Sequence, residues 1–127
     1  MIAVVIDASV WVAAVDPGDS AHDASERFLV TIAATQCQVV VPTIARVEVA
    51  CALARRFGDP TRAAELADAL FDARFVHEQI VDASLAARAL TLGTAAKLRG
   101  ADALYAAVAE REGAALVTLD HEMLDRA

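Results

Sequence analysis

Lysine is almost absent from this chain of 127 residues: its eleven basic residues are ten arginines and Lys97. With 18 acidic residues, the formal net charge is −7, and the isoelectric point lies near 4.8. Non-specific nucleic-acid binding depends on many Lys and Arg side chains that neutralise phosphates. The composition therefore argues against a broadly basic binding surface. A local phosphate site remains open, because arginine suits bidentate phosphate contacts.

Long hydrophobic runs and cysteines are also scarce. No apolar segment approaches the roughly 20 residues that span a bilayer, and the N-terminus lacks the basic and long apolar segments of a signal peptide. We therefore expect a cytoplasmic protein with no membrane contact. The two cysteines, Cys37 and Cys51, are expected to be reduced packing residues, with Cys51 on the apolar face of a helix.

Alanine dominates what is present. The hydrophobic fraction is 57%, but 31 of those residues are alanine, which favours helices more than it adds buried area. A chain of this length is expected to form a single domain, residues 1–127, with a real core. We expect alanine-packed helices around a few strands rich in Val, Ile and Leu.

Short β-branched runs alternate with longer helical segments, which indicates an α/β fold with a parallel sheet. Strands are expected at residues 3–7, 39–41, 75–81 and 115–119, the third at a sheet edge. Helices are expected at residues 8–12, 20–34, 43–58, 60–73, 82–97, 100–113 and 121–127. Ser20 and Thr43 are predicted N-caps, Gly58 and Gly113 are predicted helix ends, and the helix at 82–97 can break near Gly93.

Four carboxylates occur where such a sheet would gather them. Asp7 ends the apolar run of the first strand, and Asp120 directly follows the last strand. Glu48 lies in the opening turns of the helix after the second strand, and Asp102 lies in the first turn of the helix that begins after Gly100. The C-terminal ends of parallel strands and the N-termini of the helices beside them share one side of the sheet. We therefore expect the four acids to converge.

Converging carboxylates repel one another unless a cation binds between them or some are protonated. A hard divalent ion such as Mg²⁺ or Mn²⁺ is the natural partner, and such a site suits a metal-dependent phosphodiesterase. Asp7 and Asp102 are the expected direct ligands, Glu48 would bind the ion or orient a bound water, and Asp120 would complete the set. Each acid taken alone also fits a helix cap or first-turn position, Asp120 above all.

Two arginines are candidates for contact with a substrate phosphate. Arg46 precedes Glu48 by two positions, and Arg99 precedes Asp102 by three. A solvated or ion-paired role is an equal alternative for Arg46 and the favoured one for Arg99. Trp11 lies in an apolar run, so we expect it in the core or in a dimer contact rather than stacked on a base.

The four acids lie in the segments 5–9 (VIDAS), 42–49 (PTIARVEV), 98–103 (LRGADA) and 116–120 (LVTLD). These segments resemble the acidic motifs of PIN-domain proteins, in particular the small VapC-type toxins of bacterial toxin–antitoxin pairs. Each motif is weak by itself. The four in this order, with the expected elements between them, extend along nearly the whole chain.

The resemblance implies a PIN-like α/β/α sandwich, with a mainly parallel sheet of four or five strands covered by helices. It implies a Mg²⁺- or Mn²⁺-dependent endoribonuclease, with one or two ions, that cleaves RNA phosphodiester bonds with metal-activated water. It also implies a homodimer and a small antitoxin protein that covers the active site. Such proteins commonly add an edge strand after the last motif, whereas this sequence ends at Ala127. The expected sheet therefore leaves an edge for a partner to cover.

Carried over position by position, the resemblance assigns the catalytic and metal-binding roles to Asp7, Glu48, Asp102 and Asp120. Ser9 and Thr118 match the family's hydroxyl residues, which can hydrogen-bond a ligand. Hydroxyls that bond nearby backbone are the ordinary alternative for both.

Two rival functional classes differ from a nuclease toxin. A catalytically degenerate PIN-like module used only for binding would have no need for a repulsive acidic cluster. A phosphotransfer protein fits poorly, because haloacid-dehalogenase-type phosphatases use a second acid where this chain has Ser9. A receiver domain needs a lysine at a strand end, whereas Lys97 is expected in a helix.

Overall fold

A computed structural model describes residues 2–126 of the protein. Within this range the chain forms one four-stranded sheet in the order β3-β2-β1-β4, and every neighbouring pair is parallel. The strands are β1 (Ala3–Ile6), β2 (Gln38–Pro42), β3 (Val76–Gln79) and β4 (Ala115–Val117). The predicted parallel α/β fold is therefore confirmed, and the predicted third strand lies at an edge.

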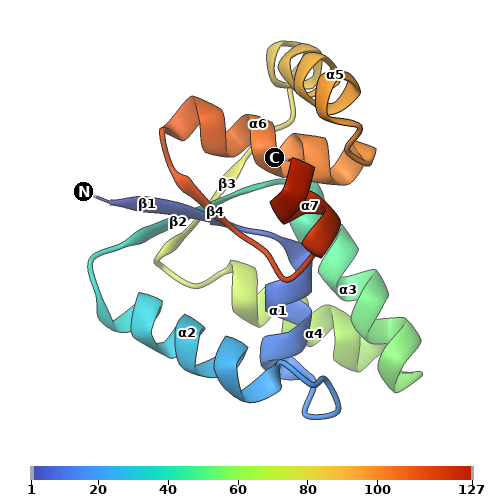
Figure 1. The fold of residues 1–127 in the computed structure, drawn as a ribbon. Helices are drawn as coiled ribbons and strands as arrows, with labels where there is room; N and C mark the ends of the chain where they lie inside the picture. Colours follow the sequence, from blue (N-terminus) through green and yellow to red (C-terminus); the bar gives the residue numbers. More distant parts are fainter. Residues whose placement is uncertain (1, 127) are drawn as a thin grey trace.

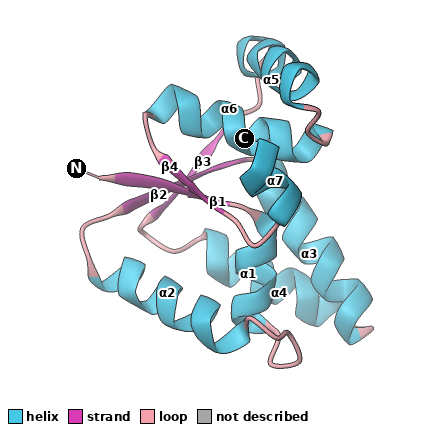
Figure 2. Cartoon of the chain, viewed as in Figure 1, coloured by secondary structure: helices cyan, strands magenta, loops and turns pink. Residues whose placement is uncertain are grey.

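The described residues also form seven helices, which cover both faces of the sheet. They are α1 (Ala8–Val15), α2 (His22–Ala34), α3 (Ile44–Phe57), α4 (Pro60–Phe71), α5 (Ala83–Ala96), α6 (Gly100–Glu112) and α7 (His121–Arg126). In Figure 1, α5 and α6 lie above the sheet, and α1, α2 and α4 lie below it. Figure 2 shows the strands enclosed between these layers. Across residues 2–126, none of the helices is both long and apolar enough to cross a bilayer.

The register of the sheet places the ends of β1 and β4 side by side. Ile6 pairs with Val117, and the backbone N–H of Asp7 donates to the carbonyl of Val117 at 3.1 Å. Thr118 follows Val117, so the residues after the two strands meet at the same edge. This register brings residues that are more than 100 positions apart in the sequence into contact.

Trp11 anchors the core beneath the central strands. Its side chain is fully buried, its Nε1–H donates to the carbonyl of Ile6 at 3.0 Å, and its ring centroid lies 4.9 Å from that of Phe71. A buried indole needs such a polar partner for its N–H. Trp11 is therefore a core residue in this structure, not a platform for base stacking.

Several helix ends follow the predicted signals, and two caps differ. Gly58 and Gly113 adopt left-handed backbone angles just after α3 and α6. Residues other than glycine adopt these angles less readily. The prediction that Ser20 caps α2 is wrong: the Asp19 carboxylate accepts from the Ala21 N–H at 2.9 Å, and α2 begins two residues after Ser20. Thr43 precedes α3 with helical backbone angles and makes no side-chain cap.

Gly93 lies inside a continuous helix rather than at a break. A Cβ added at this position would lie 2.7 Å from the Cβ of Ala103, which is closer than two carbon atoms pack. Gly93 therefore allows α5 and α6 to approach each other closely, and the predicted break is wrong. Lys97, with φ of 58°, ends the helix instead.

The side chain of Cys51 faces solvent, contrary to the expected packing role. The buried face of α3 consists of Ala45, Val49 and Leu53, each four residues apart. Cys51 lies two positions from Val49 and therefore points to the other side of the helix. Cys51 is exposed, Cys37 is partly buried, and both are free thiols.

Candidate functional site

Asp7 lies between the end of β1 and the start of α1, and both oxygens of its carboxylate accept hydrogen bonds from the protein. The residue is 4% exposed. Its Oδ1 accepts hydrogen bonds from the backbone N–H of Ser9 at 3.1 Å and from the Ser9 hydroxyl at 2.5 Å. Its Oδ2 accepts from the Thr118 hydroxyl at 2.5 Å. Both carboxylate oxygens are thus oriented, and Asp7 is also the N-cap of α1.

The same two hydroxyls connect Asp7 to the segment that carries Asp120. The Ser9 Oγ accepts from the Leu119 N–H at 3.0 Å, and the Thr118 Oγ1 accepts from the Asp120 N–H at 2.9 Å. Asp120 Oδ1 in turn accepts from the N–H groups of Glu122 at 2.9 Å and Met123 at 3.4 Å. Asp120 therefore caps α7, which is the alternative role that the sequence predicts for it. Within residues 2–126, Oδ2 of Asp120 accepts no hydrogen bond.

Glu48 lies in the second turn of α3 and is half-buried. Burial raises the pKa of its carboxyl, and the negative charges of Asp102 and Asp7 raise it further. The Tyr105 hydroxyl opposes this increase because it donates to Glu48 Oε1 at 2.7 Å, which favours the ionised carboxylate. The net direction of the pKa shift is upward.

Asp102 lies in the first turn of α6, and its charge is poorly compensated. Burial raises the pKa of its carboxyl most, the charges of Asp120 and Asp7 add to the increase, and Arg99 lowers it. Within residues 2–126 no backbone or side-chain group donates a hydrogen bond to this carboxylate. Of the four predicted acids, Asp102 is the one with both oxygens free for an added ligand.

The charges of these acids affect one another, but the side chains do not enclose an ion as they stand. Asp7 and Asp102 both raise the pKa of Glu48, and Asp120 and Asp7 both raise that of Asp102. Over residues 2–126, however, no three His, Cys, Asp or Glu side chains are arranged to hold a metal ion. The donor set, carboxylates with adjacent hydroxyls, fits Mg²⁺ or Mn²⁺ in its chemistry.

The raised pKa of Glu48 predicts a pH-dependent cost to the fold. From its ordinary pKa of 4.5 up to the raised value, the folded chain binds more protons than the unfolded chain, so stability falls as pH rises through this window. Replacing Glu48 with Gln removes this cost and keeps an oxygen for Tyr105. We expect the variant's stability advantage over the metal-free wild type to grow from acid pH to pH 7, measured by urea unfolding. An advantage that is independent of pH would contradict this origin.

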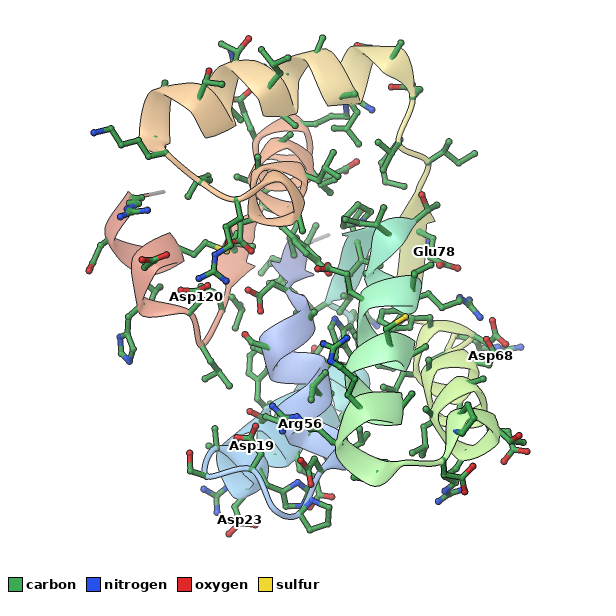
Figure 3. The ribbon with its side chains drawn as sticks, turned by 90° about the vertical axis from the view of Figure 1, so that its right-hand side faces the viewer. Asp19, Asp23, Arg56, Asp68, Glu78 and Asp120 are labelled. Atoms are coloured by element: carbon green, nitrogen blue, oxygen red, sulfur yellow. The ribbon has the colours of Figure 1, made fainter. Side chains whose placement is uncertain are left out.

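Arg46 is ion-paired away from the acids. Its guanidinium contacts Asp68, Asp72 and Glu78, each at 2.8 Å. These contacts join α3 to α4 and β3. Figure 3 shows Asp68 and Glu78 on one side of α3 and Asp120 on the other. Arg46 therefore has the ion-paired role that the sequence left open, and its guanidinium is already bound by three carboxylates.

Arg99 lies close to the acids and remains accessible. Its side chain is 74% exposed, and its guanidinium lies 3.5 Å from the carboxylate of Glu122. Its positive charge lowers the pKa of Asp102. At this exposure the ion pair with Glu122 contributes little to stability, so Arg99 is free to exchange it for another anion.

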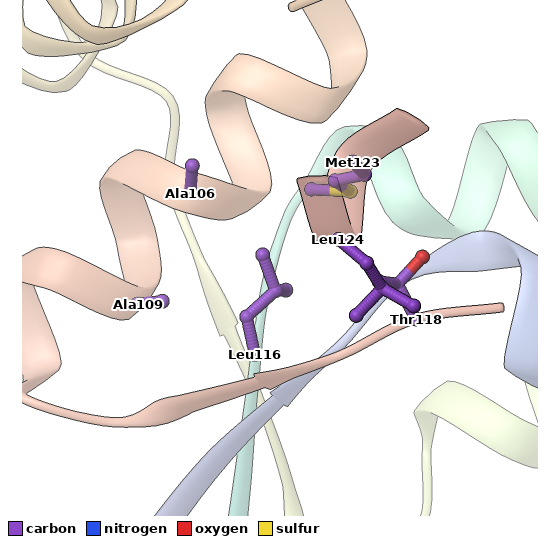
Figure 4. Close-up of a pocket in the computed structure, with 6 residues that line it drawn as sticks. All are labelled: Ala106, Ala109, Leu116, Thr118, Met123 and Leu124. Carbon is purple, nitrogen blue, oxygen red and sulfur yellow. The ribbon is translucent and has the colours of Figure 1, made fainter. Parts of the chain in front are cut away.

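A small, mostly apolar pocket adjoins the site between α6, β4 and α7. It is lined by Ala106, Ala109, Leu116, Thr118, Met123 and Leu124 (Figure 4). Thr118 belongs both to this pocket and to the hydrogen-bond network of Asp7. The pocket therefore brings residues of α7 beside Thr118.

Tyr105 is the residue at this site that the sequence motifs do not identify. It lies three positions after Asp102 on α6, a spacing that places both on neighbouring parts of one helix face. It is also the only tyrosine of the chain. A single tyrosine one turn after a first-turn acid was the signal in the sequence, but its acceptor, Glu48, is 57 residues away.

Comparison with known families identifies the fold. The model of the PIN domain matches residues 4–127, so the chain belongs to the PIN-domain family. The predicted family is therefore confirmed. The comparison with curated proteins gave no match.

Solved structures of similar fold include a VapC toxin and a VapBC protein bound to DNA. VapC20 of Mycobacterium tuberculosis, described as a toxin that cleaves the sarcin-ricin loop, has 24% identity and a TM-score of 0.83, over 96% of this chain and 93% of that one. VapBC2 from Rickettsia felis, bound to a DNA fragment from its promoter, has 17% identity and a TM-score of 0.74, over 99% and 93% of the two chains. At these identities the likeness establishes a shared fold.

Proposed function

We propose that this protein is a metal-dependent endoribonuclease, a hydrolase that cleaves RNA phosphodiester bonds with metal-activated water. The observation that carries the proposal is the carboxylate of Asp102. It has a raised pKa, neighbouring acids and no protein donor among the described residues, in a chain of the PIN-domain family. A divalent cation would relieve this repulsion and occupy the free oxygens.

The four acids take different roles in this proposal. Asp7 and Asp102 bind one or two Mg²⁺ or Mn²⁺ ions, Glu48 binds an ion or orients a bound water, and Asp120 completes the set. When bound, the metal supplies a water of lowered pKa and offsets charge on the phosphate. The bound ion also offsets the negative charges of the four acids. This reduces the repulsion between the acidic site and the phosphates of an RNA substrate.

The remaining residues hold this arrangement and contact the substrate. The hydroxyls of Ser9 and Thr118 fix both oxygens of Asp7, and orienting partners of this kind sustain metal affinity. Arg99, exposed beside Asp102, is the proposed contact for an RNA phosphate. We exclude Arg46 from this role because three carboxylates already bind it.

We further propose that the protein is the toxin of a toxin–antitoxin pair, homodimeric, with a small antitoxin that covers the acidic site. The shared fold with VapC20 and VapBC2 supports this. Exposed apolar side chains, among them Ile80 at 70% and Leu90 at 68%, offer surface for protein contacts. Growth arrest on expression, relieved by co-expression of a small protein encoded next to it, will test the toxin role.

A catalytically degenerate PIN-like binding module is the second candidate. Two observations favour it: the described side chains form no ready three-ligand metal site, and Asp120 serves as a helix cap. Under this alternative the acids remain but bind no divalent ion. Metal binding by the purified chain therefore separates the two functions.

The decisive test is cleavage of bacterial total RNA by the purified chain, with Mn²⁺ and with EDTA. We expect discrete products in Mn²⁺, none in EDTA, and renewed cleavage when excess Mn²⁺ is added back, because the acids need the ion. Calorimetric titration with Mn²⁺ alone accompanies the assay. Cleavage that resists EDTA would contradict the metal mechanism, and the absence of both cleavage and Mn²⁺ binding would favour the binding module.

A further inference from the structure

We propose that Tyr105 is a positioning residue for this site: its hydroxyl holds the Glu48 carboxylate in the orientation that the metal ion requires. The inference rests on the proposed function, because it gives Glu48 a metal or a metal-bound water to face. It adds a residue outside the four acidic motifs and the two motif hydroxyls.

The contact is short, partly buried and made between two separate helices. The Tyr105 hydroxyl donates to Glu48 Oε1 at 2.7 Å, from α6 to α3. Tyr105 is 1% exposed, so the phenol ring is fixed by packing and little water reaches it. Because Asp102 lies one turn earlier on the same helix, the position of α6 sets the placement of both Asp102 and Glu48.

A restraint on Glu48 matches the way two of the other acids are held, whereas Asp102 accepts no hydrogen bond within residues 2–126. Asp7 receives two hydroxyls and a backbone N–H, and Asp120 receives two backbone N–H groups. Glu48 has a longer side chain with more rotatable bonds, and ordering it costs more conformational entropy. Among the described residues its only hydrogen-bond donor is Tyr105. The bond uses Oε1 and leaves Oε2 for an ion or a bound water.

The experiment compares Tyr105→Phe with wild type by calorimetric titration with Mn²⁺ alone and by the kcat of RNA cleavage. Removing the hydroxyl keeps the ring that fills the core. We expect Mn²⁺ affinity to fall about 10-fold, as for other residues that orient a metal ligand, and kcat to fall with it. Both proteins are titrated at a temperature where each is fully folded, as established by circular dichroism.

Val108→Ala is the matched control for loss of stability. Val108 is fully buried on the same helix, and truncating it creates a cavity without removing the bond to Glu48. We expect its Mn²⁺ affinity to equal that of wild type. Wild-type affinity and kcat in Tyr105→Phe, or equal losses in both variants, would overturn the positioning role and leave the nuclease intact. A wild-type chain that neither binds Mn²⁺ nor cleaves RNA would overturn both proposals.

Discussion

Replacing Asp102 with Asn is expected to abolish Mn²⁺-dependent RNA cleavage while leaving the metal-free protein at least as stable as wild type. The substitution removes a charge that burial, Asp120 and Asp7 all make unfavourable, as the raised pKa of Asp102 shows. It breaks no hydrogen bond to the carboxylate within residues 2–126. Activity and stability should therefore change in different directions.

Cleavage should fall by at least about 100-fold, because loss of a direct ligand should exceed the effect of losing a residue that only orients one. The stability of the metal-free proteins is measured by thermal unfolding in EDTA. Asp23→Asn is the matched control, since Asp23 also lies in the first turn of a helix but on α2 and exposed. It should keep full activity. A large decrease in the melting temperature of Asp102→Asn without metal would favour a structural role for Asp102.

Thermal unfolding of wild type and of these two variants with added Mn²⁺ measures metal binding without relying on catalysis. An ion that binds only the folded state stabilises it by about 2.7 kcal/mol at 100 times its dissociation constant. Mn²⁺ should therefore raise the melting temperature of wild type and of Asp23→Asn. Asp102→Asn should gain much less, because one of the proposed direct ligands has lost its charge.

The sequence could predict the sheet and the order of its acids because the signals are local. The β-branched runs that form β1 and β2 lie beside Gly, Pro and Asp residues that end elements, and the parallel arrangement follows from the alternation with helices. Given parallel strands, Asp7 and Asp120 must follow strand ends on one side of the sheet. The contacts between Asp7 and Thr118 are a consequence of that register.

Other features depend on packing that no local pattern specifies. A glycine inside a helical segment suggests a break, but Gly93 instead leaves room for Ala103 of the neighbouring helix. The partners of Arg46 lie on α4 and β3, 22 to 32 residues away. Tyr105 on α6 meets Glu48 on α3 although 57 residues separate them in the sequence. Such pairs become visible only when the helices are placed.

Asp7→Ala is expected to abolish cleavage and, unlike Asp102→Asn, to destabilise the metal-free fold. Asp7 accepts the cap hydrogen bond from the Ser9 N–H, and loss of a cap costs about 1 kcal/mol. The hydroxyls of Ser9 and Thr118 also lose their acceptor in a partly buried position, where each costs about 1 kcal/mol, the low end of the range for buried groups. We expect a total loss of about 3 kcal/mol, measured by urea unfolding in EDTA.

Asp59→Ala isolates the cap. Asp59 accepts a hydrogen bond from the Arg62 N–H at 3.0 Å at the start of α4, in an exposed position. Its replacement therefore removes a cap but leaves no hydroxyl without an acceptor. Asp7→Asn should fall between the two, because its amide oxygen can still accept from Ser9 but its NH₂ group cannot accept from Thr118. If Asp7→Ala loses no more stability than Asp59→Ala, the two hydroxyl bonds contribute nothing to the fold. Asp7 would then serve the fold only as the cap of α1, besides the metal role that we propose for it.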